Sequence, residues 1–127
     1  MAYANGKIFV GRLDGYLVAL DAKTGKELWK TQVVDYTQGS VITSPPMLVK
    51  NLVITGFGGG EYGTRGYISA FDQDTGKESW RLFTVPGAGD PGSETWKGDS
   101  WKFGGGVAWH IGSSIPSPKS INLQGLL

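Results

Sequence analysis

The sequence contains no cysteine, which excludes disulfide bonds and thiolate metal sites within this chain. It also has no apolar stretch approaching the roughly 18 residues of a membrane helix. Residues 1–7 show no basic region followed by an apolar run, so we expect neither a membrane span nor a signal peptide in this chain. Charge is nearly balanced, because 12 Lys and Arg oppose 11 Asp and Glu for a net charge of +1. Nucleic acid and anionic membranes are therefore not expected as partners.

Catalytic motifs are also scarce. The single histidine, His110, has no sequence partner for a metal site or a triad, and no nucleophile motif is present. Helical periodicity is not sustained in any segment. The chain is instead rich in glycine, with 21 residues, and in tryptophan, with 5, among 127. This composition favours short strands joined by tight turns, and we expect an all-β fold.

The strongest internal pattern is a repeat with a constant offset of 51 residues (72 − 21). Residues 20–29 and 71–80 share Asp, Thr, Gly, Lys, Glu and Trp at matching positions. A repeat of this length is typical of the blades of a propeller. The tryptophans that end the two copies, Trp29 and Trp80, are expected to pack between blades rather than to bind a ligand.

Each copy of the repeat predicts a β-hairpin. Strand-forming residues are followed by Asp-x-x-Thr-Gly, in which Asp bonds nearby backbone donors and Gly accepts a positive φ. Because the turn residues match, residues 16–29 and 67–80 are expected to superpose closely. Further strands are expected at 7–10 and 51–55, with a shorter candidate at 44–49.

The second copy of the repeat carries an insertion. Nine residues separate Gly56 from Gly66, whereas three separate Gly11 from Gly15, which leaves six extra residues. Insertions in repeat proteins map to loops that often carry function. This one is rich in glycine and has a single carboxylate, Glu61, so it is the first place to look for a ligand. A solvated loop carboxylate is the alternative interpretation of the same residue.

The chain after Trp80 departs from the repeat. Residues 84–93 carry turn residues throughout and predict a loop. They are followed by a segment at 96–109 with three tryptophans and a glycine triplet, which suggests stacked aromatic rings and a close approach of the backbone. We expect a partial propeller at 1–110, containing blade repeats 7–29 and 51–80 and the Trp/Gly segment 96–109, and an atypical tail at 111–127.

Four segments resemble a known family. Residues 19–29 and 70–80 are similar to the tryptophan-docking motif of quinoprotein propellers. Residues 59–67 resemble the Gly-Ala-Glu-x-Gly-x-Arg-Gly segment of quinoprotein alcohol and methanol dehydrogenases, which depend on pyrroloquinoline quinone (PQQ). Residues 96–106 are similar to their Trp-x-Gly-Asp-x-Trp-Lys-x-Gly-Gly-Gly segment. The resemblance implies an internal piece of an eight-bladed propeller, with about two blades of four antiparallel strands each.

The resemblance also implies a cofactor site. Glu61 would be a ligand of Ca²⁺ or a lanthanide that polarises a carbonyl of the quinone. The backbone of Gly58, Gly59 and Gly60 would approach the flat cofactor, Thr43 would bond one of its carboxylates, and Trp109 would stack on its ring.

Other features of the family do not match this chain. Gly58 stands where many members have serine, and Val107 where many have threonine. Four features of the family lie outside the matched residues. They are the catalytic aspartate, an asparagine that is the second metal ligand, an arginine that contacts the cofactor, and a vicinal disulfide. No catalytic residue is therefore assigned.

Two functional hypotheses follow. In the first, the chain is a fragment of a PQQ-dependent alcohol dehydrogenase that acts on a small alcohol, is periplasmic as the parent family is, and is inactive alone. In the second it is a non-catalytic propeller scaffold or interaction protein, because tryptophan-docking repeats also occur in propellers that are not enzymes. A short run of blades leaves open strand edges, so we expect a homo-oligomer in which Trp29 and Trp80 find partners in other copies.

Overall fold

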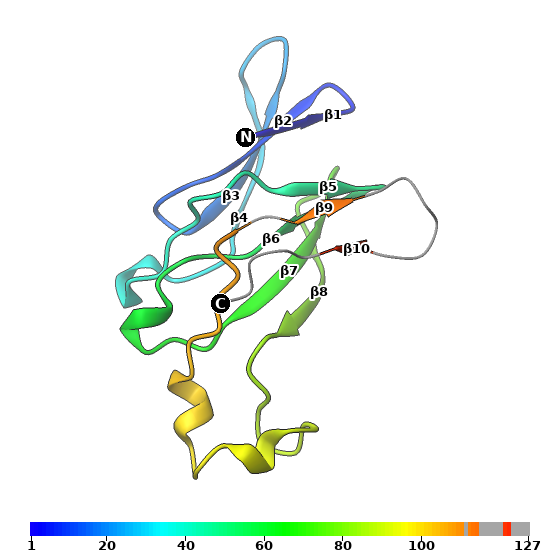
Figure 1. The fold of residues 1–127 in the computed structure, drawn as a ribbon. Coiled ribbons are helices and arrows are strands. Elements are labelled where there is room, and N and C mark those ends of the chain that lie inside the picture. The colour runs from blue at the N-terminus through cyan, green and yellow to red at the C-terminus, as the bar shows by residue number, and fades with distance from the viewer. Residues whose placement is uncertain (111, 115–120, 123–127) are drawn as a thin grey trace.

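The protein folds into two consecutive four-stranded antiparallel sheets, in each of which the strands follow chain order (Figure 1). The structure is a computed structural model that describes residues 1–110, 112–114 and 121–122. These residues form strands and short 3-10 turns and no α-helix, so the all-β prediction is confirmed. The first sheet contains β1 (Ala2–Ala4), β2 (Lys7–Gly11), β3 (Tyr16–Asp21) and β4 (Glu27–Gln32), and the second contains β5 (Met47–Val49), β6 (Leu52–Thr55), β7 (Tyr67–Asp72) and β8 (Glu78–Phe83).

Smaller elements surround the two sheets. Strands β9 (Ser113–Ser114) and β10 (Ile121–Asn122) pair with each other, and most of the expected tail at 111–127 lies outside the described residues. Across the described part of the chain, no helix is long and apolar enough to cross a membrane. The 3-10 turns span Tyr36–Gln38, Gly60–Tyr62, Ser93–Thr95 and Ser100–Phe103.

The two repeated hairpins have the same pairing. Tyr16 lies opposite Gln32 in the first, and Tyr67 lies opposite Phe83 in the second, each partner shifted by 51 residues. Both hairpins have a register shift at the same place, after Ala19 and after Ala70. The expectation of equivalent hairpins is therefore confirmed down to the position of this irregularity.

The turn of each hairpin shows why the sequence repeats. The Asp72 carboxylate accepts the Thr75 backbone N–H at 2.9 Å and the Asp74 backbone N–H at 2.9 Å. These bonds favour the ionised form, and the pKa of Asp72 lies below its ordinary value, chiefly because of the Thr75 N–H. Gly76 completes the turn with a φ of 71°, where a side chain is unfavourable. The corresponding aspartate and glycine of the first hairpin adopt the same arrangement.

The first strand of each sheet differs from the expectation. Strand β1 was not predicted, although it pairs with β2 across the two-residue turn Asn5-Gly6, whose φ angles are 51° and 72°. Asn-Gly between short strands is a strong hairpin signal and could have been used. The candidate strand at 44–49 forms only from Met47 onward, because two prolines precede it and cannot donate to a ladder.

The sheets are joined by Trp29, which projects from β4 onto the turn of the second hairpin. Its indole Nε1 donates to the Gln73 carbonyl at 2.9 Å, and the Thr31 hydroxyl donates to the Gly76 carbonyl at 2.7 Å. Trp29 also lies 5.9 Å from the Phe9 ring, between ring centres. The expectation that Trp29 pairs with another copy is therefore wrong, since its partner is the next sheet of the same chain.

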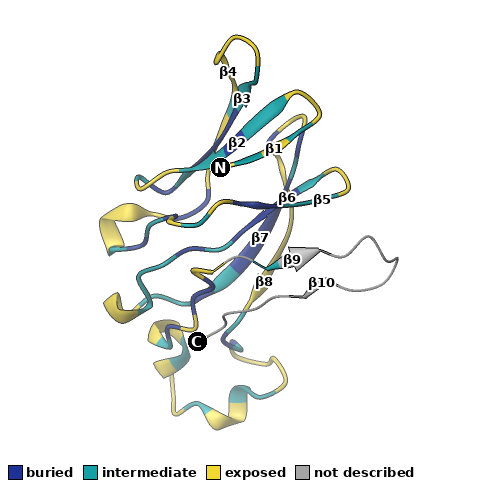
Figure 2. Ribbon diagram, turned by 45° about the horizontal axis from the view of Figure 1, so that its top comes forward, coloured by how far each residue is buried: buried dark blue, intermediate teal, exposed yellow. Residues whose placement is uncertain are grey.

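Burial falls toward the last strand of the second sheet (Figure 2). Strands β6 and β7 are largely buried, whereas every residue of β8 is exposed. Trp80, the counterpart of Trp29, is 38% exposed to solvent, and Leu82 is 56% exposed. The last strand of the first sheet, β4, thus packs against the second sheet, whereas the last strand of the second sheet, β8, is open to solvent.

Candidate functional site

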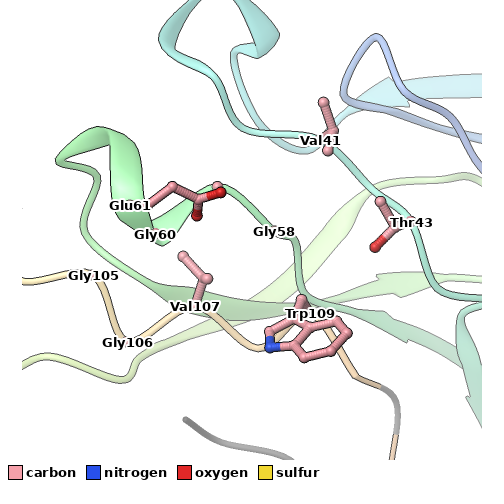
Figure 3. A pocket seen from close by; sticks show the side chains of 10 residues that line it. Val41, Thr43, Gly58, Gly60, Glu61, Gly105, Gly106, Val107 and Trp109 are labelled. Atoms are coloured by element: carbon pink, nitrogen blue, oxygen red, sulfur yellow. The ribbon is translucent and has the colours of Figure 1, made fainter.

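One cavity of about 480 Å³ lies between three segments that are distant in sequence (Figure 3). This volume is in the range of small-molecule sites, which are about 300–1,000 Å³. The first segment precedes β5, the second is the insertion between β6 and β7, and the third is the end of the Trp/Gly segment, residues 105–109. The lining residues are Val41, Thr43, Gly58, Gly59, Gly60, Glu61, Gly105, Gly106, Val107 and Trp109.

Backbone hydrogen bonds join the first segment to the insertion. The Gly58 N–H donates to the Val41 carbonyl at 2.8 Å, and the Val41 N–H donates back to the Gly58 carbonyl at 3.2 Å. This isolated bridge sets residues 41 and 43 along the cavity, because alternate residues of an extended segment face the same side. The Thr43 side chain therefore reaches the cavity, as Figure 3 shows.

The opposite wall is held in a similar way. The Gly66 N–H donates to the Gly105 carbonyl at 2.7 Å, and the Gly105 N–H donates to the Thr64 carbonyl at 2.8 Å. Further along, the Ser44 hydroxyl donates to the carbonyl of Trp109. The insertion is thus fixed at both of its ends, to the first segment at Gly58 and to the third at Gly66.

Glu61 lies in the 3-10 turn Gly60–Tyr62, between two glycines with left-handed φ angles of 104° at Gly59 and 74° at Gly63. These flanking conformations let the chain reverse tightly around the carboxylate. The side chain is exposed, and its carboxylate lies over the cavity (Figure 3). It has no hydrogen-bond or ion-pair partner among the described residues, which leaves both oxygens available to a cation.

Glycines form much of the cavity wall, for two different reasons. A Cβ at Gly59 would collide with the Gly39 carbonyl, so a side chain is excluded there. A Cβ at Gly58 would meet nothing closer than the Trp109 Cβ, at 3.6 Å, so packing does not require glycine at that position. The result is a stretch of bare backbone that a flat molecule can approach closely.

Trp109 supplies the aromatic surface of the site. It is 45% exposed, and its ring centre lies 3.7 Å from that of His110. Together with the bare backbone of Gly58–Gly60, this ring suits a planar cofactor with polar edges. Val107 is buried and apolar, so its side chain cannot form a hydrogen bond with the polar edge of such a cofactor.

The donor set for a metal is only partial. Ca²⁺ takes about 6–8 oxygen ligands, whereas Glu61 is the one carboxylate that lines the cavity among the residues with a described position. No group of three His, Cys, Asp or Glu that could hold a metal occurs among the residues the structure describes. A metal at this position would need further ligands from the cofactor, from water or from other parts of a larger protein.

The structure brings the sequence-derived candidates together in this one cavity. Thr43, the glycines at 58–60, Glu61 and Trp109 all line it, although whether they bind a cofactor stays a prediction. Sequence reasoning did not place Val41, Gly105 or Gly106 in the site. The alternation that puts residue 41 on the side of residue 43 was available, but nothing local reveals that residues 105–106 face the insertion.

Comparison with known proteins places this geometry in context. A family model described as the β-propeller domain of PQQ glucose, ethanol and alcohol dehydrogenases matches residues 5–115. A lanthanide-dependent methanol dehydrogenase from Methylacidiphilum fumariolicum (strain SolV) is 44% identical over an alignment of 127 positions, which covers 86% of this chain and 21% of the relative. Quinohemoprotein alcohol dehydrogenase ADH IIB from Pseudomonas putida is 51% identical over an alignment of 112 positions, which covers 79% of this chain and 16% of the relative.

A solved structure agrees with these sequence matches. The chain superposes on a europium-containing methanol dehydrogenase with a TM-score of 0.84 at 43% identity, covering 91% of this chain and 23% of the other. The chain therefore spans about a fifth of the length of the proteins it matches.

Proposed function

Because the chain belongs to the β-propeller domain family of PQQ-dependent glucose, ethanol and alcohol dehydrogenases, we propose that its cavity forms part of a PQQ site in an alcohol-oxidising enzyme. The observation that carries this proposal is the convergence of Glu61, Trp109 and the glycine wall on one cavity of about 480 Å³. These groups come from segments about 50 residues apart and match what a planar, anionic cofactor with an associated cation requires.

Each residue would have a distinct part in holding the cofactor. Trp109 would stack on the ring, because its indole face is partly exposed at the cavity. The Thr43 hydroxyl would donate to a cofactor carboxylate, and the backbone at Gly58–Gly60 would lie against the ring. Glu61 would supply one oxygen ligand to Ca²⁺ or a lanthanide. A quinone held there would supply the hydride acceptor for alcohol oxidation, and the cation held by Glu61 would supply a Lewis acid.

The finer features of the parent enzyme are part of the same proposal. A small alcohol is the proposed substrate, and the periplasm is the proposed location. A lanthanide is an alternative to Ca²⁺, in keeping with the lanthanide dependence named for one relative. The non-catalytic scaffold hypothesis gains no specific support, since no observation on the cavity favours it.

Metal-dependent cofactor binding tests the proposal. We expect the PQQ absorbance spectrum to change on titration with the protein in the presence of Ca²⁺ or La³⁺. In Glu61→Gln the apparent affinity should fall by about tenfold or more, because the anionic oxygen is lost while the shape is kept. Glu94→Gln is the control, since Glu94 is an exposed carboxylate in another 3-10 turn away from the cavity. Equal binding by all three proteins, or none by any, would contradict the proposal.

We also propose that the chain self-associates through the open face of β8. The Trp80 and Leu82 side chains are 38% and 56% exposed there, and soluble proteins seldom leave such residues together on an unpaired edge strand. Light scattering over a dilution series should show a mass above that of one chain, and Trp80→Ser should lower it. A wild-type protein that stays monomeric and folded at micromolar concentration would refute the proposed association.

A further inference from the structure

The cavity wall opposite Glu61 is formed by residues that come directly after a long loop in the sequence, and this loop contains no strand. Residues 84–104 leave the end of β8, pass through two 3-10 turns and return at Gly105 (Figure 1). An irregular segment of this length needs tertiary contacts to hold its end in one position. The contacts that hold this loop in place therefore help to determine the positions of Gly105 and Gly106 in the cavity wall.

The Arg65 side chain links the insertion to that loop through hydrogen bonds. Arg65 Nε donates to the Val85 carbonyl at 2.9 Å, and Nη2 lies 3.5 Å from Asp90 Oδ2. The same Asp90 oxygen accepts the Gly87 N–H at 2.8 Å, so the guanidinium and the backbone share one acceptor. The Arg65 side chain is only 18% exposed, which strengthens these contacts relative to those of a solvated surface arginine.

Two aromatic rings lie close to the same guanidinium. Its Cζ lies 3.8 Å from the Phe83 ring centre and 4.7 Å from the Trp101 ring centre. Phe83 ends β8 and Trp101 lies near the far end of the loop, so Arg65 ties the two ends of the loop together. Packing here is close, because a Cβ at Gly87 would lie 2.8 Å from Arg65 Nη2.

The backbone of Arg65 completes the link to the cavity. It forms a parallel bridge with Gly105, flanked by the Gly66-to-Gly105 and Gly105-to-Thr64 hydrogen bonds. Arg65 also lies four residues after Glu61, within the same insertion. One residue therefore joins the element that holds the carboxylate to the wall that faces it.

Building on the PQQ site proposed above, we propose that Arg65 is a positioning residue that sets the separation between Glu61 and the Gly105–Val107 wall. It acts through the loop and touches neither the cofactor nor the substrate, since it does not line the cavity. Lysine cannot replace it, because only the planar guanidinium can stack on two rings while donating in plane to a carbonyl.

Amide hydrogen exchange on the full chain tests the structural half of this proposal. Arg65→Lys and Arg65→Met should raise the exchange rates of the Gly66 and Gly105 amides by about tenfold or more, because their acceptors become mobile. The amides of β2 and β3 should keep their protection, which shows that the sheets remain folded. Arg81→Met is the matched control, since Arg81 stacks on Tyr67 at 4.1 Å and pairs with Glu78 but does not contact the loop. Unchanged exchange at Gly66 and Gly105 would overturn the proposal, whether or not the chain binds a metal.

Terbium binding, followed by luminescence sensitised through tryptophan, tests the functional half. Tb³⁺ affinity should fall about tenfold or more in both Arg65 variants and stay within about twofold of wild type in Arg81→Met. Faster exchange with unchanged Tb³⁺ affinity would show that Arg65 does not position the site. If wild type itself binds no Tb³⁺, the metal site proposed above fails, and the exchange result still decides whether Arg65 fixes the wall.

Discussion

Gly76→Ala is expected to lower the free energy of unfolding by about 3 kcal/mol, a large fraction of the ~5–15 kcal/mol of a typical domain. Gly76 has a φ of 71°, where an alanine costs about 1 kcal/mol or more. Its new Cβ would also lie 2.6 Å from two carbons of the Trp29 indole and 2.9 Å from the Thr31 hydroxyl. Overpacking of this kind costs about 1–3 kcal/mol, and the contact it disturbs is the one that joins the two sheets.

Gly25→Ala separates these two contributions. Gly25 occupies the same place in the first hairpin with a φ of 72°, but a Cβ there would meet nothing within 4 Å. The expected loss is therefore only the backbone cost, about 1 kcal/mol. Urea unfolding followed by circular dichroism measures both variants. Equal losses for the two glycines would show that Trp29 docking contributes little to stability.

The second large effect concerns catalysis. Supplied with PQQ and Ca²⁺, the 127-residue chain is expected to oxidise alcohols no faster than its Glu61→Ala variant. Hydride transfer from an alcohol needs a base to take the hydroxyl proton, and a positioned base contributes about 10²–10⁴-fold. Among the described residues the cavity has one carboxylate, which would be committed to the metal, and neither a second carboxylate nor a histidine of this part of the chain lines it.

Turnover is measured with an artificial electron acceptor, using free PQQ and Ca²⁺ without protein as the background. A rate for the wild-type chain clearly above that of Glu61→Ala would mean that the chain supplies its own base, and the assignment of no catalytic residue would have to be withdrawn. Metal-dependent PQQ binding without turnover agrees with the proposed function, because binding uses groups that this cavity has and catalysis needs one that it lacks.

Self-association and the cofactor site rest on different parts of the molecule and can fail separately. The Trp80 face lies on the outer strand of the second sheet, whereas the cavity lies between the insertion and the segments on either side. A monomeric Trp80→Ser protein that still binds PQQ with metal would support the cofactor site independently of assembly.

The sequence by itself determined the elements whose hydrogen bonds close within a few residues. Asp21 and Asp72 bond N–H groups two and three residues ahead, and a glycine with positive φ follows, so matching residues impose matching hairpins. The Asn5-Gly6 turn is also local, and Asn-Gly between two short strands is enough to predict it. The likeness of four segments to the quinoprotein family also indicated the candidate site residues before their positions were known.

Only the tertiary structure decided which distant segments meet. Three such contacts span 20 to 45 residues of sequence. Trp29 docks on the turn at Gln73 and Gly76, Gly105 pairs with the insertion, and Arg65 bonds the loop after β8. A backbone N–H or an indole can bond any carbonyl that packing presents, so the local sequence does not name the partner. The choice is made when the two sheets and the loop pack together, because this arrangement buries apolar side chains between them while pairing these polar groups.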